Sequence, residues 1–281
     1  MRKQQLSHSR RGALLVAAVL LAGCQASVNG SHRLNGPPAK ILVLQNSTVN
    51  PSTGDSQLTA VLSQHTTYIE ITAGHNTTSP RIAGAMEPTA VYKSFARFRE
   101  NALAGQIPGY ARAVIYDPER WAATPLPEQR NPRAYMLRFS RLARVHGLIP
   151  ILAPARDLTL VPGGSCRKRS RESLTEAYLR CGLATAVDHA AVLVVQGQVD
   201  EFNLTLYRHF IAVAARQARA VNRHVAVVAE LATAPDGHPA TSAQIVAAAR
   251  SVAGLVAGYS LAARRTDLPT AEVVLKSFRQ P

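Results

Sequence analysis

Two kinds of hydrophobic pattern alternate along this chain. Short apolar, β-branched runs recur, and longer stretches with the apolar spacing of helices separate them. The runs cover residues 41–44, 67–71, 111–116, 148–153, 191–196, 224–229 and 254–260. Runs of this kind are typical of strands that are buried on both faces of a parallel sheet. The alternation therefore predicts parallel strands joined by right-handed helical crossovers.

The intervening stretches carry helix start and stop signals. One predicted helix begins after Asn131 as N-cap, with Pro132 at its first position, and ends at Gly147. Its predicted apolar face consists of Tyr135, Phe139, Leu142 and His146. A second covers 203–221, with Leu206, Phe210, Val213 and Gln217 on one side, and a third begins at a capping box, Thr241–Gln244. Further helices are predicted at 56–64, 88–104, 171–188 and 268–278.

The number and length of the units favour one fold class. Seven strand–helix units of about 25–45 residues fit an α/β protein built as a TIM-type (β/α) barrel, with one strand short or missing. The alternative is an open doubly wound sheet, which usually has a glycine-rich first turn when it binds nucleotides. The residues after the first run, Val43-Leu44-Gln45-Asn46-Ser47, contain no glycine. We therefore expect a single barrel domain over 40–281.

The first residues are typical of an export signal. Four basic residues and no acid precede an apolar run of about a dozen residues, which is shorter than the ~20 that span a membrane. Leu21-Ala22-Gly23-Cys24 resembles the lipobox of bacterial lipoproteins. That resemblance implies a signal peptide at 1–23, acyl chains such as palmitate on Cys24, and a lipid-anchored protein on the extracytoplasmic face of the cell membrane. A cleaved, freely secreted protein is the alternative.

The export route and the segment that follows it are less specific. Ser9–Leu14 also resembles a twin-arginine export signal, with ordinary Sec export as the alternative. Residues 24–39 are rich in Ser, Asn, Gly and Pro, which predicts a flexible tether.

The chain is strongly basic, with a net charge of +15. Without residues 1–23, 28 basic and 17 acidic residues remain, a net charge of +11. For an exported protein, anionic lipid headgroups or wall polymers are more plausible counter-ions than nucleic acid. The alternative is a solvated arginine-rich surface with no specific partner.

Two cysteines remain beside Cys24. Thiols of an exported protein usually pair, so we expect a disulfide between Cys166 and Cys181. A loop of this length would contribute roughly 3 kcal/mol to stability. The alternative is that Cys181 is a buried free thiol within a helix.

Familiar catalytic motifs are missing. The sequence contains no Walker A, G-x-G-x-x-G, H-E-x-x-H, G-x-S-x-G or C-x-x-C pattern, and its histidines have no metal-ligand spacing. We therefore expect no cofactor and no dedicated transition-metal site.

The barrel prediction supplies a positional argument instead, because functional groups of such barrels gather at the carboxyl ends of the strands. The residues at the predicted strand ends are Glu70, Asp117, Glu119, Arg156, Asp157, Gln196, Gln198, Glu230 and Tyr259. Period-two geometry would point Asp117 and Glu119 to one side, and likewise Gln196 and Gln198.

Three segments carry a resemblance to known proteins. They are Tyr116–Trp121 with Thr124-Pro125 and Glu128-Gln129, then Ala153–Leu158, then Gln196-Gly197-Gln198. They resemble uncharacterised secreted actinobacterial lipoproteins that are similar to glycoside-hydrolase-like TIM barrels. The resemblance covers about residues 88–260 and implies a fold rather than a reaction.

Two functions remain open. In a glycosidase, Glu119 would be the general acid and Asp117 or Asp157 the nucleophile or base. Trp121 would stack on a sugar ring, and Gln196, Gln198 and Glu230 would bind ligand. Alternatively, the barrel is non-catalytic and binds a glycan or an anionic wall polymer, its strand-end acids pairing with arginines such as Arg156 or capping helices.

Overall fold

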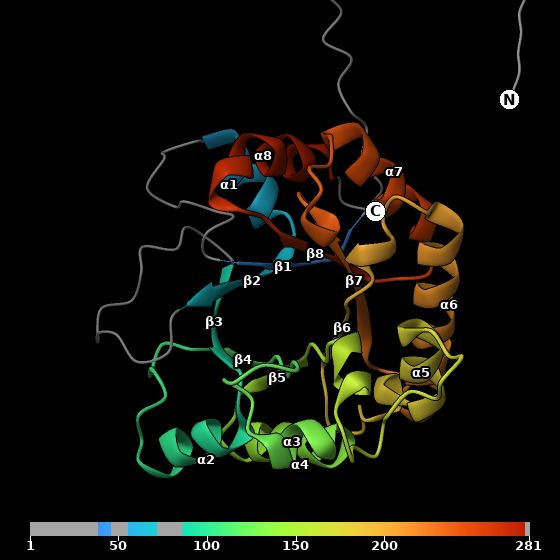
Figure 1. Cartoon of the computed structure of the whole chain (residues 1–281). Helices are drawn as coiled ribbons and strands as arrows, with labels where there is room; N and C mark the ends of the chain where they lie inside the picture. Colours follow the sequence, from blue (N-terminus) through green and yellow to red (C-terminus); the bar gives the residue numbers. More distant parts are fainter. Residues whose placement is uncertain (1–38, 46–55, 72–85, 279–281) are drawn as a thin grey trace, which may run out of the picture. The chain divides into compact units, whose positions relative to one another are not determined.

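The chain folds into a closed barrel of eight parallel strands surrounded by helices (Figure 1). The computed structural model describes residues 39–45, 56–71 and 86–278. Each strand pairs with its neighbours in chain order, and β1 pairs with β8 to close the barrel. The TIM-type barrel prediction is therefore confirmed. The predicted signal peptide, Cys24 and the tether lie outside the described residues.

The strands are β1 Ile41–Leu44, β2 Thr66–Ile71, β3 Met86–Tyr92, β4 Ala113–Tyr116, β5 Ile149–Leu152, β6 Val192–Val195, β7 Ala226–Ala232 and β8 Gly258–Ala262. The helices are α1 Ser56–Ser63, α2 Phe95–Leu103, α3 Leu126–Arg130, α4 Pro132–Val145, α5 Leu174–Cys181, α6 Leu204–Val221, α7 Ser242–Val252 and α8 Leu268–Ser277. Short 3₁₀ turns follow several strands, including η2 Arg156–Leu160 and η4 Gln198–Asp200. No helix within the described ranges is long and apolar enough to cross a membrane.

The strand that the sequence pattern missed is β3. The prediction of one helix over 88–104 is wrong, because this segment contains the end of β3 and then α2. Ser94 separates them: its backbone is extended, and its hydroxyl accepts a hydrogen bond from the backbone N–H of Arg97. Glu87 and Pro88 near the start of β3 interrupt the apolar run, which hid the strand from a search for β-branched residues.

The predicted helix limits hold better than the predicted helix faces. Helix α4 runs from Pro132 to Val145, but Asn131 makes no side-chain capping bond. Of the predicted face, Phe139 is buried and Tyr135 and Leu142 are partly buried against the core, whereas His146 is exposed. Met136, Ser140 and Ala143 complete the buried face, which is thus displaced toward these residues.

Helix α6 shows the same displacement. It begins after Asn203, whose side chain accepts a bond from the N–H of Leu206. Leu206 itself is 53% exposed, while the buried face consists of Tyr207, Phe210, Ile211, Ala214, Ala215 and Ala218. The capping box at the start of α7 is present as predicted, with Thr241 and Gln244 bonded reciprocally.

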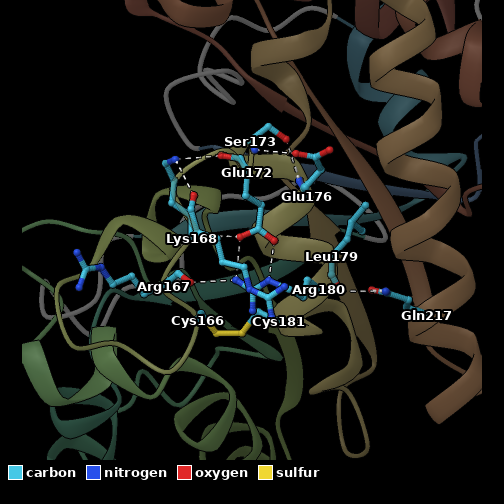
Figure 2. A network of polar contacts seen from close by, with 11 residues as sticks. Cys166, Arg167, Lys168, Glu172, Ser173, Glu176, Leu179, Arg180, Cys181 and Gln217 are labelled. Atoms are coloured by element: carbon cyan, nitrogen blue, oxygen red, sulfur yellow. Dashed lines mark hydrogen bonds and ion pairs between the residues drawn. A yellow bond between two sulfur atoms is a disulfide. The ribbon is translucent and has the colours of Figure 1, made fainter.

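The expected disulfide joins Cys166 to Cys181, with 5.1 Å between their Cα atoms. It closes the segment that follows η2 onto the end of α5 (Figure 2). Arg180 reinforces the closure, since its guanidinium donates to Glu172 at 2.6 and 2.9 Å and to the carbonyl of Arg167 at 2.9 Å. The loop is therefore held both by the disulfide and by the ion pair between Arg180 and Glu172.

Apolar side chains fill the interior of the barrel. This inner cluster contains Val43, Tyr68, Ala113, Ile115, Ile151, Ala153, Val192, Val194 and Val228, with Val91 packed against it. A second, larger cluster lies between the strands and the helices. The interior of the barrel is therefore a packed core.

Candidate functional site

The side chains at the mouth continue the inward-facing rows of the barrel. Since a strand alternates its side chains, the residue two positions beyond an inward-facing one points to the same side. The inward-facing residues Tyr68, Val91, Ile115, Val194 and Val228 are followed at that spacing by Glu70, Lys93, Asp117, Gln196 and Glu230. Strand ends β2, β3, β4, β6 and β7 thus bring three acids, one lysine and one amide together.

Asp117 is fixed from two directions. Its Oδ2 forms an ion pair with Nζ of Lys93, and its Oδ1 accepts a hydrogen bond of 2.9 Å from Nε2 of Gln196. The same amide nitrogen donates to the carbonyl of Ala153 at 2.8 Å, which holds Gln196 in place. The carboxylate of Asp117 is therefore fixed in orientation across the mouth.

Lys93 is the site residue that the sequence reasoning missed. It directly follows β3, so its role became visible only with that strand. Burial alone lowers its pKa, but the charge and hydrogen bond of Asp117, followed by Glu119 and Glu70, more than reverse this and raise it. Its Nζ also lies 4.6 Å from the ring centroid of Trp121. The lysine thus stays charged and connects Asp117 to Trp121.

Glu119 lies beside this pair but has a free carboxyl group. No described residue donates a hydrogen bond to its carboxyl oxygens, while its backbone N–H donates to Oγ1 of Thr124 at 3.3 Å. Burial and the charge of Asp117 raise the pKa of Glu119 to about 7, although Lys93 partly opposes them. The charge of Asp157 also contributes to this rise.

Two further carboxyls share this environment. Burial, followed by the charge of Asp117, raises the pKa of Glu70 to about 7 and that of Glu230 well above its ordinary value. Oε2 of Glu230 is inaccessible to solvent and has no hydrogen-bond partner in the structure. Protons bound to these two groups keep negative charge at the mouth low around neutral pH.

A groove of about 400 Å³ opens next to these acids. It is lined by Glu119, Ala155, Arg156, Asp157, Ser173, Leu174, Thr175, Gln196, Gln198, Val199 and Asp200. Asp157 accepts a hydrogen bond of 3.0 Å from the backbone N–H of Arg120, and burial raises its pKa. Gln198 contributes a buried Oε1 with no hydrogen-bond partner. Gln196 and Gln198 thus border one groove, although Gln198 lies in the 3₁₀ turn η4 and not in the strand alternation that the sequence prediction assumed.

Arg156 forms the wall of the groove rather than a partner for Asp157. Its Nη1 lies 2.5 Å from Oδ2 of Asp200 and donates to Oγ1 of Thr175 at 2.7 Å. Its guanidinium also stacks 5.1 Å from the ring of Phe210. The arginine therefore joins η2, α5 and η4, and leaves the carboxyl of Asp157 facing the groove.

Hydrogen bonds within the loop that follows β4 fix the positions of Lys93, Glu119 and Trp121 relative to one another. Thr124 is its centre: the hydroxyl donates to the carbonyl of Lys93 at 2.8 Å and accepts from Nε1 of Trp121 at 2.9 Å. Gln129 donates to the carbonyls of Trp121 and Thr124 at 2.7 and 2.6 Å. Trp121 is 39% exposed and thus both packs this loop and presents ring surface to solvent.

Glu128, in the same stretch, is structural. Its carboxylate accepts hydrogen bonds from the N–H groups of Phe95 and Ala96 at 2.7 and 2.9 Å and from the hydroxyls of Ser94 and Tyr116. It therefore stabilises the start of α2, where the helix dipole favours an anion. Within the part of the chain that the structure describes, no three histidine, cysteine or acidic side chains form a metal-binding group.

The comparisons with known proteins bear on the fold. The spore cortex-lytic enzyme SleL of Bacillus megaterium is 10% identical, with a TM-score of 0.49 over 88% of this chain and 76% of its own. The PgaB (BpsB) glycoside hydrolase domain of Bordetella bronchiseptica is 10% identical, with a TM-score of 0.48 over 86% and 99%. No protein-family model and no curated protein matches the chain. Its barrel assignment rests on its own closed strand pairing.

Proposed function

We propose that this barrel is a glycoside hydrolase in which Glu119 is the general acid. One observation carries the proposal: Asp117 is fixed by an ion pair with Lys93 and a hydrogen bond from Gln196, while the neighbouring Glu119 has no hydrogen-bond partner among the described residues and a pKa of about 7. A charge-paired carboxylate beside a carboxyl whose raised pKa lets it carry a proton near neutral pH is the combination that acid–base cleavage of a glycosidic bond uses.

The roles follow from these environments. Protonated Glu119 donates its proton to the glycosidic oxygen as the bond from that oxygen to the anomeric carbon breaks. A carboxylate then stabilises or attacks the anomeric carbon, or it activates the water that does so. Asp117 fits this role because its charge is balanced by Lys93, and Asp157 is the second candidate because it faces the same groove.

Polar groups around the acids suit a sugar. Gln196 and Gln198 line the groove, where Oε1 of Gln198 has no hydrogen-bond partner, and the carboxyl of Glu70 can donate or accept once protonated. The exposed part of the Trp121 ring offers a stacking surface at the edge of the site. The site thus combines the acid pair with hydrogen-bonding groups in an open groove.

The test is turnover of wall and plant polysaccharides as a function of pH. Glu119 must be protonated to act, so activity should be present below pH 7 and fall about tenfold per pH unit above it. Release of reducing ends from a broad glycan panel measures this. Inactivity on the whole panel, with glycan binding retained, would replace the hydrolase proposal with the non-catalytic binding barrel.

We further propose that the protein is anchored by a lipid on Cys24, on the extracytoplasmic side of the membrane. The lipobox-like Leu21–Cys24 segment supports this proposal. Cys24→Ser should move the protein from the membrane fraction to the medium or the soluble envelope fraction, as immunoblotting of fractionated cells would show. Wild-type protein that already fractionates as soluble would contradict the anchor.

A further inference from the structure

The end of the barrel opposite the mouth carries exposed apolar side chains. Helices of this fold run antiparallel to the strands, so the last residue of each helix lies at the face where the strands begin. Leu103, Val145 and Val221 are the last residues of α2, α4 and α6, and they are 74%, 76% and 46% exposed. Apolar side chains this exposed at helix ends gain nothing from the fold itself.

Helices α2 and α4 pack side by side (Figure 1). A groove of about 400 Å³ runs between them, from Phe95 at the mouth-side start of α2 to Leu103 and Val145 at the opposite end. Phe95, Leu103, Leu137, Leu142 and Val145 line it together with Arg99, Arg138 and Arg141. No acidic residue lines the groove. The groove is thus apolar at its base and cationic at its rim.

Further basic residues surround the same end of the barrel. Lys40 precedes β1, Arg112 precedes β4, Arg144 lies in the last turn of α4 and Arg223 precedes β7, and all four are exposed. The acids at this end, Glu87, Asp188 and Glu100 in the last turn of α2, are fewer. This face therefore has an excess of positive charge next to its apolar residues.

The chain itself enters the barrel at this face. Sixteen positions separate Lys40 from Cys24, which at full extension span at most about 55 Å. A lipid on Cys24 would thus keep the start of β1 within about 55 Å of the bilayer. At such a high effective concentration, a weak contact suffices to orient the barrel.

We propose that the α2–α4 groove and the surrounding strand-start face bind the surface of an anionic phospholipid bilayer. Leu103 and Val145 enter the headgroup region, and Arg99, Arg138 and Arg141 contact lipid phosphates. The mouth with Asp117 and Glu119 then points away from the membrane, toward polymers outside the cell. The lipid contact does not depend on the hydrolase proposal.

A second exposed apolar group lies at the opposite end and supplies the matched control. Val199, Phe202, Leu204 and Leu206 are exposed near the start of α6, on the mouth side. A membrane contact through these residues would bring the mouth toward the lipid. The two orientations therefore differ in whether Val145 or Leu206 touches the bilayer.

The test uses the full acylated chain in vesicles, with one environment-sensitive fluorophore on Val145→Cys or on Leu206→Cys. Nitroxide-labelled lipid headgroups serve as quencher, in phosphatidylcholine vesicles with and without phosphatidylglycerol. We expect the label at 145 to be quenched at least several-fold more than the label at 206. The difference should vanish without phosphatidylglycerol and at high salt.

Charge reversal separates the groove from general basicity. Arg99→Glu with Arg141→Glu should abolish the quenching at 145, whereas Arg167→Glu with Arg171→Glu, on the mouth side, should leave it unchanged. Equal quenching at both labels, stronger quenching at 206, or burial of the label at 145 by self-association of the protein would each overturn the proposal. None of these variants is expected to lose hydrolase activity. The lipid-contact proposal and the hydrolase proposal are therefore tested separately.

Discussion

Gly258→Ala is expected to prevent the barrel from closing. A Cβ atom on Gly258 would lie 1.8 Å from the carbonyl oxygen, 2.7 Å from the carbonyl carbon and 2.9 Å from the nitrogen of Ile41. All three are backbone atoms of β1, whose Ile41 is paired with Gly258 in the register that joins β1 to β8. Relief of the clash must separate these strands, since a backbone cannot move aside as a flexible side chain can.

The expected result is loss of soluble, folded protein. Opening β1 from β8 breaks the ladder and exposes the inner cluster around Val43, and two unpaired strand edges invite aggregation. Soluble yield, near-ultraviolet circular dichroism and thermal unfolding measure the effect. Gly109→Ala is the control, because no atom lies within 4 Å of its added Cβ, and it should change stability by no more than about 0.5 kcal/mol. A Gly258→Ala protein that unfolds at the wild-type temperature would refute the argument.

Glu119→Gln is expected to lower kcat/KM by about 10²–10⁴ without unfolding the protein, if the hydrolase proposal holds. The amide keeps the size and polarity of the side chain but carries no acidic proton. The fold does not use this carboxyl, because no described residue hydrogen-bonds to it. Because folding raises the pKa of Glu119, ionisation of this carboxyl lowers the free energy of unfolding as pH rises from about 4.5 to about 7.

The melting temperature of Glu119→Gln at neutral pH should therefore equal or slightly exceed that of the wild type. Glu100→Gln is the control, since Glu100 is an exposed carboxylate paired with Arg97 on α2. Differential scanning fluorimetry beside initial rates on the best substrate of the panel separates the outcomes. A large drop in melting temperature would make Glu119 structural, and undiminished turnover would remove it from the catalytic step.

In the candidate site, some residue positions follow from the alternation of side chains along each strand. Asp117 and Gln196 lie at the mouth because each continues an inward-facing row, which alternation along a strand determines. Lys93 obeys the same rule but was missed, because Glu87 and Pro88 interrupt the strand that precedes it. The alternation rule itself holds for Lys93. The residue was missed because β3 was not recognised as a strand.

Residue type alone did not separate functional from structural acids. Glu119 and Glu128 stand nine positions apart in one segment, yet Glu128 accepts bonds from two backbone N–H groups and two hydroxyls. Arg156 is adjacent to Asp157 in sequence but pairs with Asp200, which is 44 positions away. Partners of this kind depend on how loops from different strands meet.

The sequence by itself determined the strand–helix alternation, the barrel class, the helix limits at Pro132 and Thr241 and the pairing of Cys166 with Cys181. These follow from local periodicity, from capping chemistry and from the number of thiols. Only the tertiary structure decided that Lys93 pairs with Asp117 and orients it, that the Glu119 carboxyl has no hydrogen-bond partner among the described residues and a pKa of about 7, and that Gly258 touches Ile41. Burial, ion pairing and close backbone approach arise between segments distant in the chain, so no local pattern records them.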